Sequence, residues 1–402
     1  MIELANKVDC CGCSACEQIC PKQCIMMKPD EEGFLYPVIN KEICIDCGRC
    51  EKVCPVLNKK QGHSLLDAYA FNNVNNQERY DSASGGFFSA ISKYLVRQNG
   101  VVFGAAYNSE VKVVTSFTDK EEELWKFRNS KYVQSEVKDS YKEAKKLLLL
   151  GKKVLFSGTP CQIQGLLNFL GKEYENLYTM DFVCHGVPSP KVFEKYKVYI
   201  QQKYGSNLVT YQFRTKRKGY NGKSYGCANI ELGDGRTLHT EDTKGSDLFM
   251  SKSFFEEVCS RPSCHVCRFK DKERNCDFTV FDCWSVQKIA PNLSDDKGTT
   301  LLVVNTQKGK DLFEKASDFY QVNKVDLDKA IMLDGLMMLH SVPAHPLRNA
   351  FLLDLDRMSV EDLTKKYLTP KGMKRVKIFI RDITERLGLL RYIRYVKYAL
   401  KR

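Results

Sequence analysis

Two copies of one cysteine pattern occupy the first 60 residues, and they constrain the fold more than any other feature of the sequence. Each copy reads C-x-x-C-x-x-C-x-x-x-C-P, and the copies begin at Cys10 and Cys44. The 402 residues contain 18 cysteines, and the initial MIELANKVD lacks the basic start and apolar run of a secretory signal. We therefore expect a cytoplasmic protein with reduced thiols, in which crowded cysteines indicate metal binding rather than disulfides.

The spacing within each copy suits an iron–sulfur cubane. Three thiolates in one loop can hold three corners, and the fourth cysteine points to the other cluster in two-cluster ferredoxins. Zinc also takes four thiolates, but two complete copies that each end in proline favour iron and sulfide. Cys11 and Cys24 fall outside the register, so we expect neither to be a ligand. The predicted ligands are Cys10, Cys13, Cys16 and Cys54 for one [4Fe-4S] cluster, and Cys44, Cys47, Cys50 and Cys20 for the other.

Beyond residue 60, predicted strands alternate with predicted helices, which indicates an α/β fold with a mainly parallel or mixed sheet. The predicted strands span 67–73, 101–107, 112–117, 153–157, 177–183, 209–214, 226–232, 277–281 and 300–305. The predicted helices span 84–98, 140–150, 159–171 and 191–204. We expect three parts: an α+β ferredoxin-like domain (1–60), a larger mixed-sheet α/β core (61–345) and a basic amphipathic helical tail (346–402).

The positive charge of the chain is concentrated near its C-terminus. The formal net charge is +13, and residues 371–402 contain eleven Lys and Arg against two acidic residues. Because the body is nearly balanced and carries no nucleic-acid-binding motif, we expect no nucleic acid partner. Residues 381–402 have the pattern of an amphipathic helix, which predicts either peripheral contact with an anionic membrane or docking on the body. No apolar run is long enough to predict a transmembrane helix.

Four further cysteines lie where an α/β core places its chemistry. Cys161 falls in the first turn of a predicted helix, where exposed N–H groups favour a thiolate. Cys184 follows the next predicted strand, so both thiols lie at one sheet edge if these strands are parallel neighbours. Cys264 and Cys267 form a C-x-x-C pair that is too small to hold a cubane alone. The four together are a candidate third cluster.

Other interpretations of these cysteines remain open from spacing alone. Cys264 and Cys267 can share a zinc ion with Cys259 and Cys276. A cysteine at a strand end is often a small buried apolar residue. A nucleophilic pair of Cys161 with His185 is compatible with the residue types, but nothing in the sequence fixes its geometry.

Three segments carry groups that suit a dinucleotide. Ser84-Gly85-Gly86 precedes a predicted helix, where small residues allow close approach of a phosphate, although a plain N-cap turn has the same pattern. Residues 128–135, RNSKYVQS, concentrate donors and one aromatic side chain, which is also compatible with a solvated loop. Asp282 and Trp284 follow a predicted strand and are expected at the same edge of the sheet.

The order of several motifs resembles the coenzyme F-420 hydrogenase/dehydrogenase beta subunit family, of the type found in bacterial polysaccharide clusters. The resemblance covers about residues 5–310 and rests on SGGFFSA, GAAY, SKYVQS, LFSGTPCQIQGL, CHGVPSP, RPSCHVCRFK, FTVFDCW and KGTTLLVVNT. It implies FAD and a core cluster held by the GTPC, strand-end and C-x-x-C cysteines, here Cys161, Cys184, Cys264 and Cys267. The candidate flavin-binding residues are Ser84, Gly85, Gly86, Ser130, Lys131, Tyr132, Gln134, Thr159, Gln162 and Asp282.

Together the motifs and the resemblance predict an iron–sulfur flavoprotein oxidoreductase. Electrons would pass between a ferredoxin, or another one-electron carrier, and a small organic substrate or deazaflavin. The clusters carry single electrons, and a flavin exchanges one or two. The alternative is a non-catalytic electron-transfer subunit of a larger redox complex, which would be inert without its partner enzyme.

Overall fold

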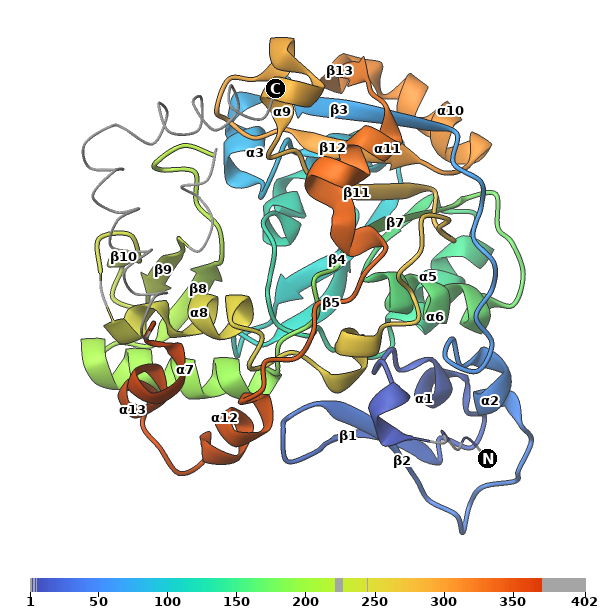
Figure 1. Cartoon of the computed structure of the whole chain (residues 1–402). Helices are drawn as coiled ribbons and strands as arrows, with labels where there is room; N and C mark the ends of the chain where they lie inside the picture. The colour runs from blue at the N-terminus through green and yellow to red at the C-terminus, as the bar shows by residue number, and fades with distance from the viewer. Residues whose placement is uncertain (1, 3, 5, 221–226, 244, 371–402) are drawn as a thin grey trace.

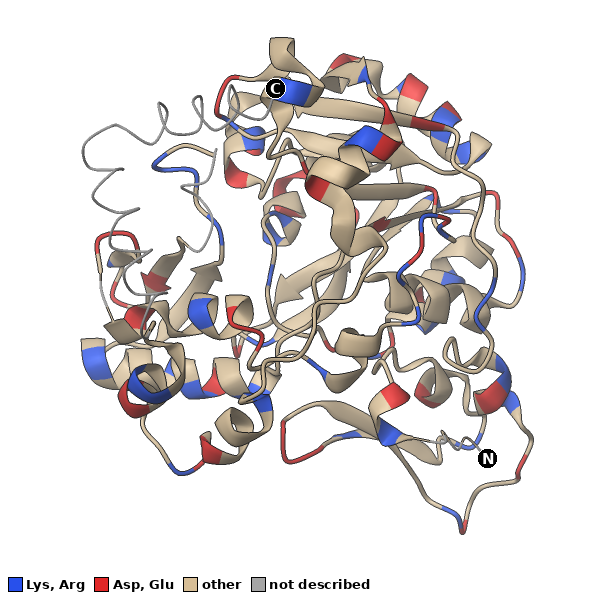
Figure 2. Cartoon of the chain, in the orientation of Figure 1, with Lys and Arg blue, Asp and Glu red and all other residues tan. Residues whose placement is uncertain are grey.

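The computed structural model describes residues 2–370 except residues 3, 5, 221–226 and 244. The membrane contact predicted for 381–402 therefore lies outside the described residues. None of the described helices combines the length and the apolar composition needed to cross a membrane. Figure 2 shows Lys and Arg interspersed with Asp and Glu over the described elements, in line with the nearly balanced charge of the body.

The N-terminal domain repeats its local structure as its sequence repeats its cysteines. It consists of η1 (Lys7–Asp9), α1 (Ala15–Ile19), β1 (Ile25–Pro29), β2 (Leu35–Ile39) and α2 (Arg49–Val53). Each of α1 and α2 follows a residue in the left-handed conformation and ends at an extended cysteine, Cys20 or Cys54. The strands β1 and β2 form an antiparallel hairpin between the two halves. The cysteines of each pattern thus occupy a loop and the end of the helix that follows it.

The core is built on an eight-stranded sheet in the order β13-β3-β12-β11-β7-β6-β4-β5. Its strands are β3 (Asp67–Asn73), β4 (Val101–Tyr107), β5 (Val113–Thr118), β6 (Val154–Ser157), β7 (Leu177–Phe182), β11 (Phe278–Asp282), β12 (Thr300–Val304) and β13 (Tyr320–Lys324). Neighbours among β4, β6, β7 and β11 pair in parallel, and the outer pairs are antiparallel. The predicted mixed α/β sheet is confirmed, and β6 and β7 are parallel neighbours.

Helices cover both faces of this sheet because each places apolar residues on one stripe. On α4 (Phe87–Arg97), the side chains of Phe87, Ile91 and Leu95 recur at four-residue spacing and pack on one face, beside α10 (Gln307–Lys315). The helices α5 (Ser140–Leu149) and α6 (Pro160–Leu170) cover the opposite face, and the N-terminal domain packs against them. Figure 1 shows this domain below α5 and α6.

A second, smaller sheet was not foreseen from the sequence. The strands β8 (Leu208–Gln212), β9 (Asn229–Leu232) and β10 (Thr237–His239) form it in the order β10-β9-β8, with antiparallel pairing. It packs against α7 (Pro190–Tyr204) and α8 (Phe249–Phe255) through an aromatic core that includes Phe193, Tyr196 and Tyr211. Alternating elements indicate strands but not which sheet receives them, so the strands expected at 209–214 and 226–232 were found outside the main sheet.

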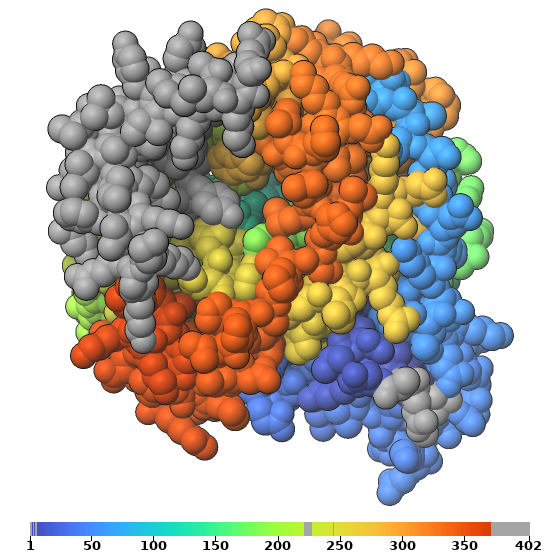
Figure 3. All heavy atoms as spheres, viewed as in Figure 1, coloured from blue at the N-terminus to red at the C-terminus, as the bar shows by residue number. Residues whose placement is uncertain are grey.

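Short helices complete the fold. They are α3 (Asn76–Asp81), η2 (Glu121–Phe127), η3 (Gly245–Leu248), η4 (Pro262–Val266), α9 (Val286–Ile289), η5 (Pro291–Leu293), η6 (Ser317–Phe319), α11 (Leu327–Ala330), η7 (Ile331–Gly335), η8 (Leu336–Met338), α12 (Arg348–Asp354), α13 (Val360–Leu363) and η9 (Thr364–Leu368). The last three pack on the core of the small sheet. Figure 3 shows a hollow in this face of the molecule, bordered by the orange segment of the chain and the yellow segment below it.

The Ser84-Gly85-Gly86 turn has a packing role that its sequence pattern concealed. A Cβ atom on Gly85 would lie 2.2 Å from the Phe71 carbonyl oxygen and 2.5 Å from the Thr300 backbone nitrogen. The N-cap of α4 is Gly86, with φ 85°, rather than Ser84, so the predicted N-cap is wrong by two residues. Gly85 is therefore required where the turn presses against β3 and β12.

Candidate functional site

The second predicted N-terminal ligand set lines a single cavity. Cys20, Cys44, Cys47 and Cys50 all border it, although the first lies in the other copy of the pattern. The cavity also contains Cys24, whose Sγ lies 3.3 Å from that of Cys20. This hydrogen bond raises the pKa of the Cys24 thiol to about 12. Cys24 is thus suited to remain a protonated donor to its neighbour.

The first predicted set gathers between α1 and α2. Cys13, Cys16 and Cys54 are buried, and Cys10 is half-buried. Burial raises the pKa of the Cys16 thiol, and the like charges of Cys10 and Cys54 raise it further. Thiols that oppose one another's ionisation in this way become thiolates when a cation binds among them. The crossing of the two patterns, with Cys54 beside Cys10 and Cys16, fits the cluster ligands expected from the sequence.

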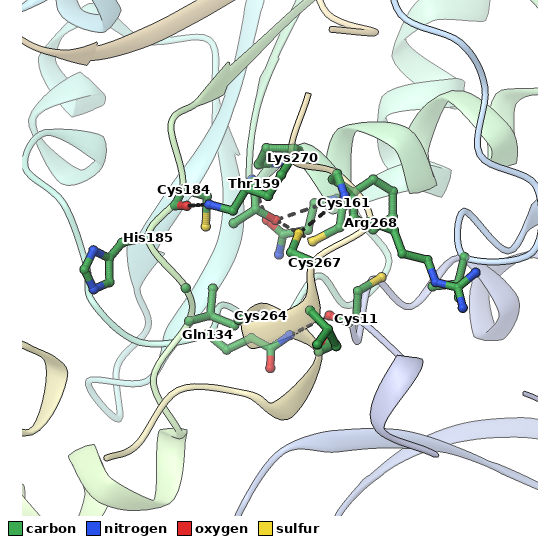
Figure 4. A pocket seen from close by; sticks show the side chains of 18 of the residues that line it. Cys11, Gln134, Thr159, Cys161, Cys184, His185, Cys264, Cys267, Arg268 and Lys270 are labelled. Atoms are coloured by element: carbon green, nitrogen blue, oxygen red, sulfur yellow. Dashed lines mark hydrogen bonds between the residues drawn. The ribbon is translucent and has the colours of Figure 1, made fainter. Parts of the chain in front are cut away.

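The four core cysteines line a second cavity, at the carboxyl edge of β6 and β7. Cys161 lies in the first turn of α6, Cys184 follows β7, and Cys264 and Cys267 lie in and after η4. In Figure 4 the sulfur atoms of Cys161 and Cys267 face the same space from different elements. The parallel pairing of β6 with β7 explains why residues 23 positions apart meet here.

The spacing of these thiols bears on the choice of metal. Within the described part of the chain, no three Cys, His, Asp or Glu side chains are spaced to hold a single metal ion. Cys259 and Cys276 do not border the thiol cavity. Cys259 is buried in the core of the small sheet, and Cys276 donates to the Phe278 carbonyl oxygen.

The first turn of α6 is fixed as its sequence predicts. Thr159 caps the helix in a reciprocal capping box with Gln162, and Pro160 occupies the first turn. The Thr159 Oγ1 atom lies 3.1 Å from Cys161 Sγ. The pKa of the Cys161 thiol is nevertheless raised, because a hydrogen bond with Cys11 and burial outweigh the favourable position at the helix N-terminus. A bound metal cation is what would convert it to a thiolate.

Cys11 is a residue whose place sequence reasoning missed. It is buried, lines the core thiol cavity and hydrogen-bonds with both Cys13 and Cys161. It therefore stands between the first N-terminal ligand set and the core set. The signal that could have found it is its position inside the first cysteine pattern but outside the ligand spacing, directly after Cys10.

The close contact of the two ligand sets depends on a glycine in α6. A Cβ atom on Gly165 would lie 3.1 Å from Cys13 Sγ, 3.1 Å from Cys13 Cβ and 3.1 Å from the Tyr141 hydroxyl. Gly165 lies one helical turn after Cys161, so both face the N-terminal domain. A helix interior normally disfavours glycine, and here its small size allows the ligand loop to approach.

Three of the candidate flavin-binding residues instead line the thiol cavity. Gln134, Thr159 and Gln162 border it together with the core cysteines. The Gln134 amide donates to the Cys11 carbonyl oxygen at 3.0 Å (Figure 4). The Gln162 amide donates to Ser135 Oγ at 3.0 Å. These side chains form part of the wall of the thiol cavity.

The other candidates lie at a second polar region, formed by the chain after β8 and the ends of β11 and β12. The Tyr220 hydroxyl donates to Asp282 Oδ1 at 2.7 Å and lies 3.2 Å from Ser84 Oγ. Asp282 also pairs with Arg214 at 2.8 Å, and the Tyr220 ring stacks on Trp284 with centroids 4.5 Å apart. Ser84 and Asp282 therefore both contact the Tyr220 hydroxyl.

The 128–135 segment is tied to this region by its side chains. Asn129 Nδ2 donates to the Arg214 carbonyl oxygen at 2.7 Å. The Lys131 ammonium donates to the carbonyl oxygens of Lys126 and Arg128, and burial lowers its pKa to about 7. Ser130 lies between Asn129 and Lys131 in the same segment. The Tyr132 ring stacks on the Phe254 ring, with centroids 4.3 Å apart. The segment is thus packed rather than a solvated loop.

Buried cations give the second polar region its character. Arg214 is 4% exposed, and its Nε and Nη2 atoms have no hydrogen-bond partner among the described residues. Lys216 is 7% exposed and donates to the carbonyl oxygens of Arg79 and Ser84. Burial, with the charges of Arg214 and Arg79, lowers the pKa of Lys216 to about 7. The free guanidinium donors of Arg214 are therefore able to bind a further anionic group.

His185 lies at the rim of the thiol cavity but does not face Cys161 as a catalytic base. Its Nε2 pairs with Glu257, and its Nδ1 lies 2.9 Å from the Met337 sulfur. Both ring nitrogens are therefore engaged, and the nucleophilic pair with Cys161 that the sequence left open has no support in this geometry.

Two protein-family models match segments of this chain. Residues 151–330 match the family described as the C terminus of the coenzyme F420 hydrogenase/dehydrogenase beta subunit. Residues 9–58 match the 4Fe-4S dicluster domain. No curated protein matches the chain. Among solved structures it is similar to a chain of the F420-reducing [NiFe] hydrogenase complex from Methanosarcina barkeri, with 16% identity, 66% of this chain and 84% of that chain covered, and a TM-score of 0.43.

The chain is therefore an iron–sulfur redox protein with a 4Fe-4S domain at its N-terminus. Residues 151–330 of its core are related to the coenzyme F420 hydrogenase/dehydrogenase beta subunit family, which the order of motifs in the sequence predicted.

Proposed function

We propose that the protein is an oxidoreductase that connects a one-electron carrier, such as a ferredoxin, to an organic substrate or deazaflavin through iron–sulfur clusters and FAD. The observation that carries this proposal is the contact between two thiol sets. The core cavity with Cys161, Cys184, Cys264 and Cys267 adjoins the first N-terminal set through Cys11. A redox domain packed directly against a second set of metal-binding thiols suits electron transfer into the core.

The thiol sets fit three [4Fe-4S] clusters. Each set supplies four thiols from a loop and one or more distant segments, as cubanes require. The clusters would supply one-electron transfer at low potential. The chain contributes the geometry: the capped first turn of α6 orients Cys161, and Gln134 holds the ligand loop of the N-terminal domain against the cavity wall. The proposed metal ligands are Cys10, Cys13, Cys16, Cys54, Cys44, Cys47, Cys50, Cys20, Cys161, Cys184, Cys264 and Cys267.

The second polar region fits the anionic part of FAD. The unpartnered Nε and Nη2 atoms of Arg214 can donate to a phosphate, and Lys216 adds a second buried cation that can take up a proton. Ser84 and Tyr220 supply hydroxyl groups beside them. FAD would supply the exchange between single electrons and a hydride.

Metal and flavin analysis of the anaerobically purified chain tests the proposal. We expect about twelve irons per chain, from three cubanes, together with one flavin. Cys161→Ala should lower iron toward about eight, while Cys259→Ala, a buried cysteine outside the cavity, should leave about twelve. About eight irons in the wild type, or about twelve in Cys161→Ala, would remove the proposed core cluster or its assigned ligand.

The same preparation distinguishes an enzyme from a subunit without activity of its own. We expect the isolated chain, reduced by a ferredoxin, to transfer electrons to an added deazaflavin. If the donor reduces the flavin but the added deazaflavin is not reduced in turn, the chain would instead be a subunit that passes electrons to a partner enzyme.

A further inference from the structure

Arg261 connects a ligand loop of the N-terminal domain with a ligand loop of the core. Its Nε donates to the Cys10 carbonyl oxygen at 2.7 Å. Its own carbonyl oxygen accepts from the Cys264 backbone N–H at 2.9 Å. One residue therefore contacts both the first N-terminal ligand set and the core ligand set, and it does so without being a ligand.

The remaining contacts of Arg261 are neutral. Nη1 donates to Gln134 Oε1 and Nη2 to the Leu35 carbonyl oxygen, each at 3.0 Å. The guanidinium lies over the Tyr36 ring, 4.2 Å from its centroid, and over the Phe34 ring at 5.4 Å. The side chain is 0% exposed. No ion pair within the described ranges uses Arg261, so its charge is buried without a carboxylate.

A second buried arginine at the same domain boundary provides a contrast. Arg348 is 5% exposed, donates from Nε to the Ser260 carbonyl oxygen at 2.8 Å, and pairs through both terminal nitrogens with Glu32. Its charge is therefore compensated within the protein. The two arginines join the domains in similar ways, but only Arg261 leaves a net positive charge in the interior.

An uncompensated buried cation is costly unless an anion lies nearby. A cubane with four thiolate ligands supplies such an anion, since the thiolates outweigh the charge of its core. Reduction adds a further electron, so a fixed positive charge favours the reduced form and raises the reduction potential.

We infer that Arg261 is a positioning residue that couples the first N-terminal ligand set to the core set: its fork fixes the ligand loop on the core, and its buried charge raises the reduction potential of the clusters it adjoins. This inference rests on the proposed function, because it requires clusters at both sets.

Redox potentiometry of the anaerobic holoprotein, followed by electron paramagnetic resonance, tests the role of the charge. Arg261→Gln removes the charge, whereas Arg261→Lys keeps it and loses the planar fork. We expect Arg261→Gln to lower the potential of at least one cluster by about 59 mV or more, a tenfold change in the equilibrium for one electron. Arg261→Lys should lower the same potential by at most half as much, because it keeps the positive charge.

The matched control is the double variant Arg348→Gln with Glu32→Gln. It removes a buried arginine from the same boundary with no change in net charge, and it should leave all potentials within the error of the wild type. Hydrogen exchange of residues 10–16 in the metal-free full chain provides a readout without clusters. We expect faster exchange in both Arg261 variants, because each lacks the planar guanidinium whose Nε donates to the Cys10 carbonyl oxygen.

The results separate this inference from the proposed function. Full iron content with unchanged potentials in Arg261→Gln would overturn the inference and leave the function standing. An equal fall in potential in Arg261→Lys, or in the double control, would show that packing rather than charge sets the potential and would also overturn it. A wild type without clusters would instead refute the proposed function.

Discussion

The lowered pKa of Lys216 predicts that FAD binding takes up a proton. In the free protein, burial and the charges of Arg214 and Arg79 lower this pKa to about 7. A diphosphate placed among the same residues reverses that balance, because an opposite charge favours the ammonium form. Lys216 should then be fully protonated in the complex at any pH below its ordinary range.

The magnitude follows from the pKa. At pH 8 a group with a pKa of about 7 is only about one-tenth protonated, so binding should take up about 0.9 proton. At pH 6 it is already about nine-tenths protonated, and uptake should fall to about 0.1. Because the bound state holds the extra proton, FAD affinity should fall as pH rises above 7, by up to about tenfold per unit.

Calorimetric titration of the flavin-free protein with FAD, in buffers of different ionisation enthalpy, measures this uptake directly. Lys216→Met should abolish it at pH 8. Lys203→Met is the matched control, because Lys203 pairs with Asp247 at 2.7 Å and its pKa is raised, so it stays charged throughout. The reasoning is refuted if Lys216→Met takes up the same proton as the wild type. Loss of the uptake in Lys131→Met would assign the proton to that other buried lysine.

Three further substitutions test the packing around the thiols. Gly165→Val should destabilise the contact of α6 with the Cys13 loop by about 1 to 3 kcal/mol, because the added side chain overpacks it. Hydrogen exchange in residues 10–16 should become faster, and unchanged exchange would contradict the close approach. Thr159→Val should cost about 1 kcal/mol of helix capping and speed exchange of the Gln162 amide roughly fivefold, whereas a slower amide would refute the cap. Cys24→Ala should leave the iron content unchanged, and a loss of about four irons would make Cys24 a ligand.

Local sequence signals predicted most of the architecture. Strands at 67–73, 101–107 and 153–157 were found within one residue of their predicted bounds. Gly, Lys and polar residues flank these apolar runs and so define where each strand begins and ends. The start of α6 was also predicted, since Thr159 and Pro160 carry both parts of a helix start. The mixed sheet and the meeting of Cys161 with Cys184 followed from these elements and their parallel pairing.

Long-range packing accounts for what the sequence did not show. Ser84 had the residue type of an N-cap, but the fit of Gly85 against β3 and β12 moved the helix start to Gly86. Gln134 lay in a segment rich in donors, yet tertiary contacts placed it in the wall of the thiol cavity. Nothing local indicated the roles of Arg214 and Arg261, although Arg261 opens the RPSCHVCRFK motif, because those roles come from burial among residues distant in the chain.

The wide separation of the core ligands along the chain has a consequence for biosynthesis. All cysteines of the N-terminal domain have been translated once residue 54 has left the ribosome, so this domain can bind its metal early. The core cavity requires β6, β7 and η4 together, and its last ligand is Cys267. A nascent chain truncated before that residue should therefore accept iron at its N-terminus and leave Cys161 and Cys184 without the rest of their proposed ligand set. Under the proposed function, translation itself would order the loading, with the N-terminal ligand sets filled first and the core set last.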